Sequence, residues 1–215
     1  MKKFLTIVLV IVSVYLLNNF FASFQKGTAE KIPFLIEPEQ RILDLRETSN
    51  SFEMKYIRNK AFMITPIAEY KITAIVLSKK NYWYDGDYGI IAPYDLSLAW
   101  GALSFKQSYS QIKVSQGYRT TSWRIKSDCL LDDYFIRTHI SNVHIIPDND
   151  YIKKQISHLR KYDRVYMEGY LVRYDLFEKN RQSYAESSLS REDLGDHACE
   201  LFLVKYIEWK REKER

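Results

Sequence analysis

The chain has 215 residues and a formal net charge of +5, of which Lys2 and Lys3 contribute +2 ahead of the first apolar stretch. Its other lysines and arginines are mixed with acidic residues, a pattern that is typical of a solvated surface and argues against nucleic acid as a partner. About 190 of the residues follow the apolar stretch, which is enough for one domain with its own core.

Residues 4–24 carry no charge and follow two lysines, the order of a segment that inserts into a membrane with its N-terminus in the cytoplasm. We therefore expect a cytoplasmic N-terminus over residues 1–3 and a transmembrane anchor over residues 4–24, with the bilayer as the first partner. The alternative is a cleaved signal peptide, although no small-x-small cleavage site lies close behind the apolar core. Either interpretation places the later residues on the periplasmic or extracellular side of a plasma membrane.

Residues 25–65 lack clean periodicity and contain two prolines, which predicts a stalk or irregular lead-in. The exported globular domain is expected over residues 66–208, followed by a charged tail over residues 209–215. Its first strand is predicted over residues 70–77, where side chains of opposite character alternate. Asp85-Gly86 then indicates a hairpin turn, with a long loop as the alternative.

The middle of the chain is predicted to contain one helix and three strands. Pro93 suits the first position of a helix, and apolar residues recur at helical spacing as far as Leu103. Two strands, over residues 112–116 and 121–125, form a hairpin around Gly117. A further strand rich in β-branched residues is predicted over residues 136–146.

The last third of the chain has the clearest pattern. A capped amphipathic helix is predicted from Asp148 to Lys161, followed by strands over residues 164–172 and 199–207, the first with Gly169 inside it. The fold class is therefore α+β, mainly antiparallel β with short helices after one transmembrane helix. This order of elements also resembles the second half of a small Greek-key barrel of the oligonucleotide/oligosaccharide-binding (OB) type.

Cys129 and Cys199 are the two cysteines, and both lie in the part of the chain predicted to be exported. An oxidising compartment makes the pair a candidate disulfide. The alternative is two buried free thiols, because the sequence does not give the distance between the two α-carbons.

One cluster of candidate binding residues lies in the predicted hairpin and contains Arg119, Trp123 and Arg124. Arginines next to aromatic rings stack on planar groups and bind phosphate or carboxylate through paired donors. The alternative is a structural hairpin whose tryptophan faces the core while its arginines face water, because Trp123 and Arg124 must point to opposite sides of a strand.

The second group of candidates comprises His144, Arg191 and Asp193. Arg191 and Asp193 lie in a polar loop over residues 187–200, where helix capping and solvation are the structural alternative to ligand binding. The four histidines show no metal-ligand spacing, so the sequence predicts no metal and no cofactor. A membrane-anchored hydrolase that uses His144 or His197 with nearby acids is the enzymatic alternative.

Four segments of the chain resemble an uncharacterised group of bacterial envelope proteins with an N-terminal anchor and no assigned activity. These segments are residues 94–101, 140–147, 163–172 and 187–195. The resemblance implies a bacterial inner-membrane protein with a single span and transfers no catalytic residue. We therefore expect a non-enzymatic binding module that contacts other envelope proteins or an envelope ligand.

Overall fold

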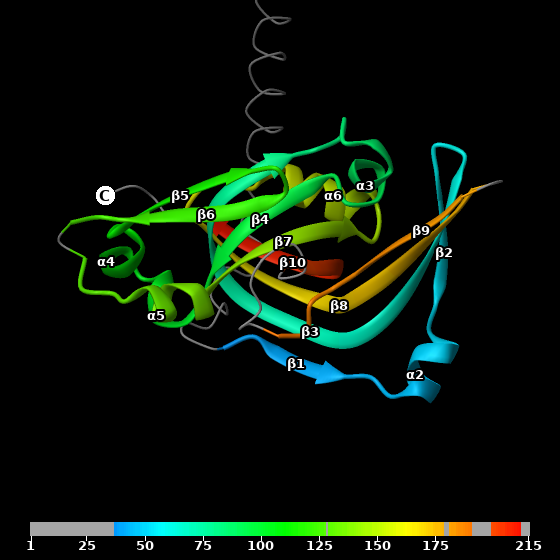
Figure 1. Cartoon of the computed structure of the whole chain (residues 1–215), viewed down its shortest axis with the longest axis horizontal. Helices are drawn as coiled ribbons and strands as arrows, with labels where there is room; N and C mark the ends of the chain where they lie inside the picture. The colour runs from blue at the N-terminus through cyan, green and yellow to red at the C-terminus, as the bar shows by residue number, and fades with distance from the viewer. Residues whose placement is uncertain (1–36, 128, 179–180, 191–198, 212–215) are drawn as a thin grey trace, which may run out of the picture. The chain divides into compact units, whose positions relative to one another are not determined.

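The computed structural model describes residues 37–127, 129–178, 181–190 and 199–211 (Figure 1). The anchor predicted over residues 4–24 lies outside these residues. Within the described ranges, no helix has the length and apolar character needed to cross a bilayer.

Eight strands form the main sheet, and two more form a separate hairpin. The main sheet consists of β1 (Glu39–Ile42), β2 (Glu53–Ile57), β3 (Lys60–Asn81), β4 (Tyr94–Ala99), β7 (Ile140–Pro147), β8 (Asp163–Glu178), β9 (Arg181–Glu186) and β10 (Glu200–Arg211). The hairpin consists of β5 (Ile112–Gly117) and β6 (Thr120–Ile125). Short helices connect them, namely α2 (Leu45–Asn50), α3 (Gly86–Ile91), η1 (Gly101–Ser104), α4 (Lys106–Tyr109), α5 (Asp133–Thr138) and α6 (Asp150–His158). The predicted mainly antiparallel α+β class is confirmed.

Five of these strands close into a ring. Their order is β3, β4, β7, β10 and β8, and β8 pairs back with β3. The pair β7–β10 is parallel, whereas the other pairs of the ring are antiparallel. Strands β3 and β8 are long enough to continue beyond the ring, where β2 and β9 extend them into a four-stranded antiparallel sheet that we call the wing.

The interior of the ring is filled by alternate side chains of its strands, as the period of two in an extended chain requires. In β3 the inward residues are Tyr70, Ile72, Ala74 and Val76, all buried in one apolar cluster. Helix α6 adds Ile152 and Ile156 to that cluster and so packs against the core. Its N-terminus is capped by the side chain of Asn149, which confirms the predicted amphipathic helix.

The segment predicted to be an irregular lead-in differs from that expectation, since residues 39–65 contain β1, α2, β2 and the start of β3. Strands β2 and β3 join through Arg58 and Asn59, which both have left-handed backbone angles, φ 49° and 62°. This is the geometry of a type I′ hairpin turn, which glycine usually marks in a sequence. The sequence analysis missed the hairpin because neither turn residue is glycine.

The helix predicted between Pro93 and Leu103 is wrong. Residues Tyr94–Ala99 form β4, which lies between β3 and β7, and all six are buried. Apolar and polar residues alternate along this strand, with Tyr94, Leu96 and Leu98 in the core. Because Leu96, Ala99, Trp100 and Leu103 also recur at helical spacing, the helical pattern was chosen instead of the period of two. At Asp85-Gly86 the alternative of a long connection holds, since residues 82–93, with α3 among them, join β3 to β4. Residues 136–146 differ from the prediction of one strand, because they divide between α5 and β7.

The predicted hairpin and the last two predicted strands are present as β5–β6, β8 and β10. Strand β10 continues to Arg211, into the predicted charged tail. Its pairing with β8 shifts register between Val204 and Tyr206, opposite Gly169. A β-carbon on Gly169 would lie 2.0 Å from the carbonyl oxygen of Leu203, so the bulge requires a residue without a side chain there.

We expect Gly169→Ala to lower the free energy of unfolding by about 3 kcal/mol, because backbone atoms of β10 have to move to admit the methyl group. Gly117→Ala is the matched control, since a β-carbon there meets no atom within 4 Å. Urea denaturation of both variants measures the difference. Equal stability of the two variants would contradict the close approach at the bulge.

Candidate functional site

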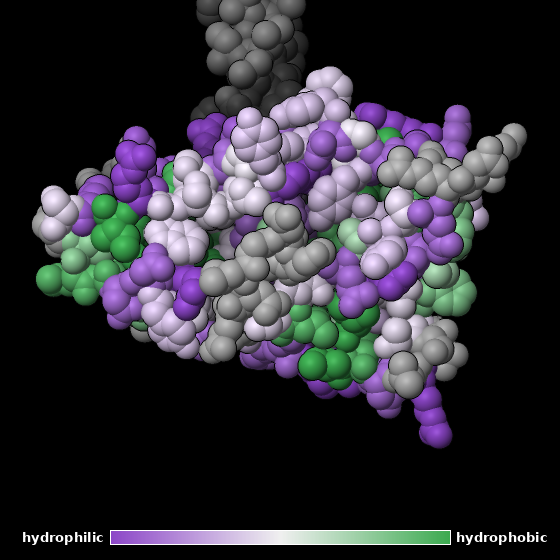
Figure 2. All heavy atoms as spheres, in the orientation of Figure 1, coloured by the Kyte–Doolittle hydropathy of each residue, from purple (hydrophilic) through white to green (hydrophobic). Residues whose placement is uncertain are grey.

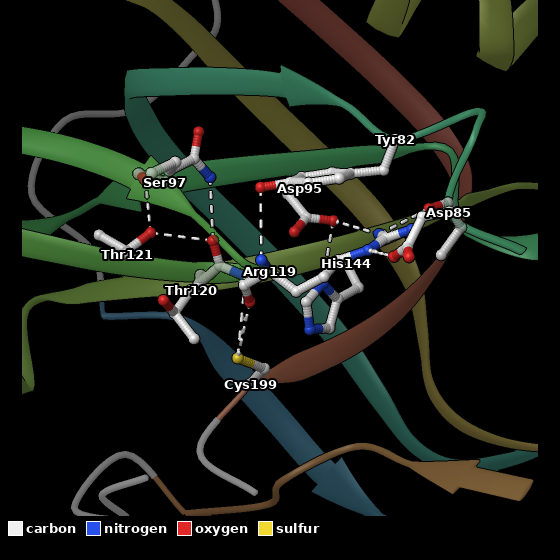
Figure 3. Close-up of polar contacts among 12 residues, drawn as sticks. Tyr82, Asp85, Asp95, Ser97, Arg119, Thr120, Thr121, His144 and Cys199 are labelled. Carbon is white, nitrogen blue, oxygen red and sulfur yellow. Dashed lines mark hydrogen bonds and ion pairs between the residues drawn. The ribbon is translucent and has the colours of Figure 1, made fainter. Parts of the chain in front are cut away.

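The candidate site lies on the outer face of β4 and β7, beneath the β5–β6 hairpin (Figure 3). Asp95 and Ser97 of β4 stand opposite His144 and Asn142 of β7, and their side chains alternate with the apolar residues that fill the ring. Asp95 and Ser97 are fully buried. Because polar groups without partners are unfavourable in such a place, the covering hairpin has to supply matching groups.

Arg119 at the tip of the hairpin supplies the main charge. Its Nη1 lies 2.7 Å from Asp95 Oδ1, and its Nε lies 2.7 Å from Asp85 Oδ2. The same Nη1 donates to the main-chain oxygen of Ala92 at 2.8 Å. One guanidinium therefore joins the hairpin to β4, to the loop before α3 and to the residue after α3.

Two tyrosines enclose the Arg119 guanidinium. Its central carbon lies 4.4 Å from the ring centre of Tyr82 and 4.6 Å from that of Tyr88. Burial raises the pKa of Tyr88 far above its ordinary value, and burial raises the pKa of nearby Tyr174 to about 12. Both phenols are therefore neutral at physiological pH, and Arg119 contacts Tyr88 through a cation–π interaction.

His144 faces Asp95 from the next strand. Its Nδ1 lies 2.9 Å from Asp95 Oδ1, a close contact that is poorly aligned for a hydrogen bond. A histidine beside a carboxylate is also the arrangement of a general base. Yet His144 is 5% exposed, and the ring of Tyr88 packs edge-on against it with centroids 5.2 Å apart. The described residues thus leave no open approach to the imidazole.

A second polar row fastens the hairpin further along the same face. Asn142 Oδ1 accepts hydrogen bonds from Thr121 Oγ1 and Gln116 Nε2, both at 2.9 Å. Its Nδ2 donates to the main-chain oxygen of Arg119 at 2.9 Å, and Thr121 shares a 2.5 Å hydrogen bond with Ser97. We call this row together with Asp85, Asp95, Arg119 and His144 the hairpin lock.

Several polar atoms of the hairpin lock have no hydrogen-bond partner among the described residues. Asp95 Oδ2 and Arg119 Nη2 are both buried without a hydrogen-bond partner among them. The lock is therefore a polar layer sealed between sheet and hairpin.

No disulfide joins Cys129 and Cys199 in the structure, so the proposed pairing is not present. Cys199 Sγ lies 3.8 Å from the main-chain oxygen of Arg119 at the hairpin tip, whereas Cys129 follows the far end of β6. The six residues of β6 span roughly 20 Å at the usual rise. That separation exceeds the distance of about 7 Å that a disulfide allows between α-carbons.

The predicted binding residues have different environments. Arg119 and His144 meet at Asp95, whereas Trp123 and Arg124 take no part in the lock. Trp123 is half-buried and donates to Asp133 Oδ1 at 3.0 Å, while Arg124 is exposed. Arg191, Asp193 and the alternative base His197 lie outside the described residues.

Sequence reasoning missed Asp85, Asp95, Tyr82 and Tyr88. Of these four, only Asp95 could have been identified from the sequence. It is an acid among apolar residues, and an acid in a buried segment needs a charged partner. The assignment of a helix to that segment concealed it.

Three exposed aromatic side chains lie on the two loops that Arg119 joins. Tyr118 at the hairpin tip is 99% exposed, and Trp83 and Tyr84 are 61% and 66% exposed. The main-chain N–H of Arg119 donates to the hydroxyl of Tyr82 at 3.3 Å, which holds the two loops side by side. We call Trp83, Tyr84 and Tyr118 the aromatic rim.

Neither metal chemistry nor relatives assign a role to this region. In the described ranges, no three His, Cys, Asp or Glu side chains are grouped so that they could hold a metal ion. Comparison with protein-family models, curated proteins and solved structures gives no match to this chain. A role for the lock and the rim therefore has to rest on their own geometry.

We expect Arg119→Met to lower the free energy of unfolding by about 3–5 kcal/mol, because it leaves the Asp95 carboxylate buried without its strongest partner. Arg124→Met on the same hairpin is the matched control and should change stability by less than about 0.5 kcal/mol, since Arg124 is exposed. Chemical denaturation of both variants is the measurement. Similar effects of the two substitutions would refute the lock.

Proposed function

We propose that the chain is a non-enzymatic binding module, tethered to the inner membrane of a bacterium through residues 4–24 and built on a barrel of the OB type. The order of the ring supports the OB assignment. Its strands follow one another as first, second, third, fifth and fourth along the chain, with one parallel pair. Helix α6 lies between the third strand, β7, and the fourth, β8, and packs against the core.

The OB type suggests where a ligand would bind. Barrels of this kind bind oligonucleotides or oligosaccharides on the face of the second and third strands and on the neighbouring loops. Here these strands are β4 and β7, whose outer face the hairpin covers. We therefore assign binding to the aromatic rim, where the connection between β3 and β4 meets the hairpin tip above that face.

Tyr118 is the observation that carries the proposal. Its φ is 51°, a left-handed conformation that is unfavourable for a bulky residue and costs about 1–3 kcal/mol. The side chain is 99% exposed, so it returns almost no burial energy to the fold. Glycine or asparagine would be more favourable in this turn. The presence of a tyrosine therefore favours a role in binding over a role in stabilising the fold.

The ligand class follows from location and chemistry. The mixed surface charge argues against nucleic acid, and residues after the anchor are expected in the envelope. Exposed tryptophan and tyrosine offer flat apolar faces with a polar edge, which suits contacts with an envelope protein or an envelope polymer. Either of these remains a candidate partner.

The hydrolase is the second candidate, and the contact between His144 and Asp95 is what favours it. This hydrolase would use His144 or His197, so the test replaces both with glutamine, which at position 144 keeps a polar group of similar size beneath Arg119. A hydrolase would lose its activity in cells while its fold persists, whereas a binding module would retain its envelope phenotype. The deep burial of His144 favours the second result.

We expect Tyr118→Gly to separate folding from binding, raising the free energy of unfolding by about 1 kcal/mol through relief of backbone strain while reducing capture of the partner. Capture can be measured in intact cells with a photo-crosslinking amino acid at position 84 of the rim, in the presence or absence of the Tyr118 substitution. The crosslinker at position 151, which is exposed on α6, is the matched control. Unchanged crosslinking at position 84 after Tyr118→Gly would overturn the assignment of binding to the rim.

A further inference from the structure

The wing has an open edge at β2. Among the described strands β2 pairs with β3 and with no other, so one side of its backbone has no partner strand. Figure 2 shows pale green, apolar atoms at the margin of the molecule where Figure 1 places β2. An open edge of this kind is a template for pairing with another strand.

The outward backbone groups of β2 belong to alternate residues. Ile57 and Lys60 close the two-residue turn and therefore form a hydrogen-bonded pair. Hydrogen-bonded pairs recur at every second residue of an antiparallel ladder, so Lys55 and Glu53 also direct their backbone groups toward β3. The N–H and C=O groups of Met54 and Tyr56 consequently point away from the wing.

The side chains of the same residues are exposed on one face of the wing. Met54 is 39% exposed and Tyr56 is 76% exposed, and Phe52 just before the strand is 54% exposed. Exposed Phe177 and Tyr184 lie on that face in β8 and β9. The edge thus combines unpaired backbone with apolar side chains that the fold leaves uncovered.

The charges of β2 lie on the opposite face of the wing and form a neutral group with two neighbours. Lys55 Nζ lies 3.3 Å from Glu53 Oε1 and donates to the main-chain oxygen of Asp148 at 2.5 Å. Lys205 Nζ lies 2.8 Å from Glu53 Oε2 and 2.6 Å from Asp148 Oδ1. Lys55 is thereby held against the domain and does not project from the edge as a blocking charge.

The order of residues 52–56 is self-complementary in an antiparallel arrangement, since it reads aromatic, acidic, apolar, basic, aromatic. With Met54 on a two-fold axis, Glu53 faces Lys55 of the second copy and Phe52 faces Tyr56 of the second copy. Moving the two-fold axis by one residue in either direction slides the second strand by two residues. It would put Lys55 opposite Lys55 or Glu53 opposite Glu53, which is unfavourable. Charge therefore selects one register.

We propose that two copies of this chain associate through β2, pairing antiparallel about Met54 so that the two wings form one continuous sheet. The symmetric arrangement uses the same patch on both copies and therefore closes as a dimer. It satisfies the outward backbone groups of β2 and joins the exposed apolar residues of the two wings into one surface. This association is independent of ligand binding at the aromatic rim.

Disulfide trapping of the full-length chain in its native membrane tests the register. A cysteine at Met54 should form a dimer on mild oxidation, because hydrogen-bonded partners lie about 5.5 Å apart between α-carbons. A cysteine at Tyr56 alone should not, since two such residues would be about four positions apart, but it should react when mixed with a cysteine at Phe52. The unsubstituted chain, with its two native cysteines, gives the baseline.

The control position is Tyr184, which is exposed on the same face but lies in β9, away from β2. We expect dimer formation from Met54→Cys to exceed that from Tyr184→Cys at least about tenfold. Equal trapping at Tyr184 and Met54, stronger trapping at Tyr56 alone, or no trapping at Met54 would each overturn the proposed pairing.

Sedimentation of detergent-solubilised full-length chain provides the second readout. Met54→Pro removes an N–H that points away from β3, so it should spare the β2–β3 ladder while it weakens the dimer at least about tenfold. Met54→Ala removes the side chain alone and should retain the dimer. Thermal unfolding checks that both variants remain folded, and a Met54→Pro chain that still sediments as a dimer would refute the role of β2.

Discussion

The ion pair between Arg119 and Asp95 is the contact on which the rest of the described domain depends. Asp95 is fully buried on β4, and a carboxylate in that position is strongly unfavourable without a counter-charge. The counter-charge comes from a hairpin 24 residues further along the chain. The hairpin, the loop before α3 and the outer face of the ring therefore have to assemble together.

The long strands β3 and β8 give the domain two separate surfaces. Within the ring they help to enclose the apolar core, and beyond it they carry β2 and β9 as the wing. The lock and the aromatic rim belong to the ring, whereas the open edge belongs to the wing. One continuous strand, β3, thus belongs both to the ring, which carries the aromatic rim, and to the wing, which carries the open edge of β2.

Sequence patterns predicted the parts of this fold that are exposed on one side. The apolar stripe of Ile152 and Ile156 predicted α6, and the alternation of side chains predicted β8. Both patterns exist because one face of each element is exposed to water. Strand β4 was misassigned although Asp95 and Ser97 alternate with its apolar residues, because its apolar residues and those that follow also fit a helical spacing. Arg119 was identified as a candidate for ligand binding, but its true partner, Asp95, is distant in sequence and lies in the strand whose pattern was misleading.

Tyr118 and Arg119 occupy one turn but contribute differently to the fold. Both residues have left-handed backbone angles, so the turn carries strain at two successive positions. Arg119 offsets its share through the buried ion pair with Asp95 and a more exposed one with Asp85, whereas Tyr118 makes no comparable contribution from its exposed ring. The contacts of Arg119 hold the backbone of the hairpin tip next to Tyr118. A turn whose backbone is held in place loses less conformational entropy on contact with a partner than a flexible loop would.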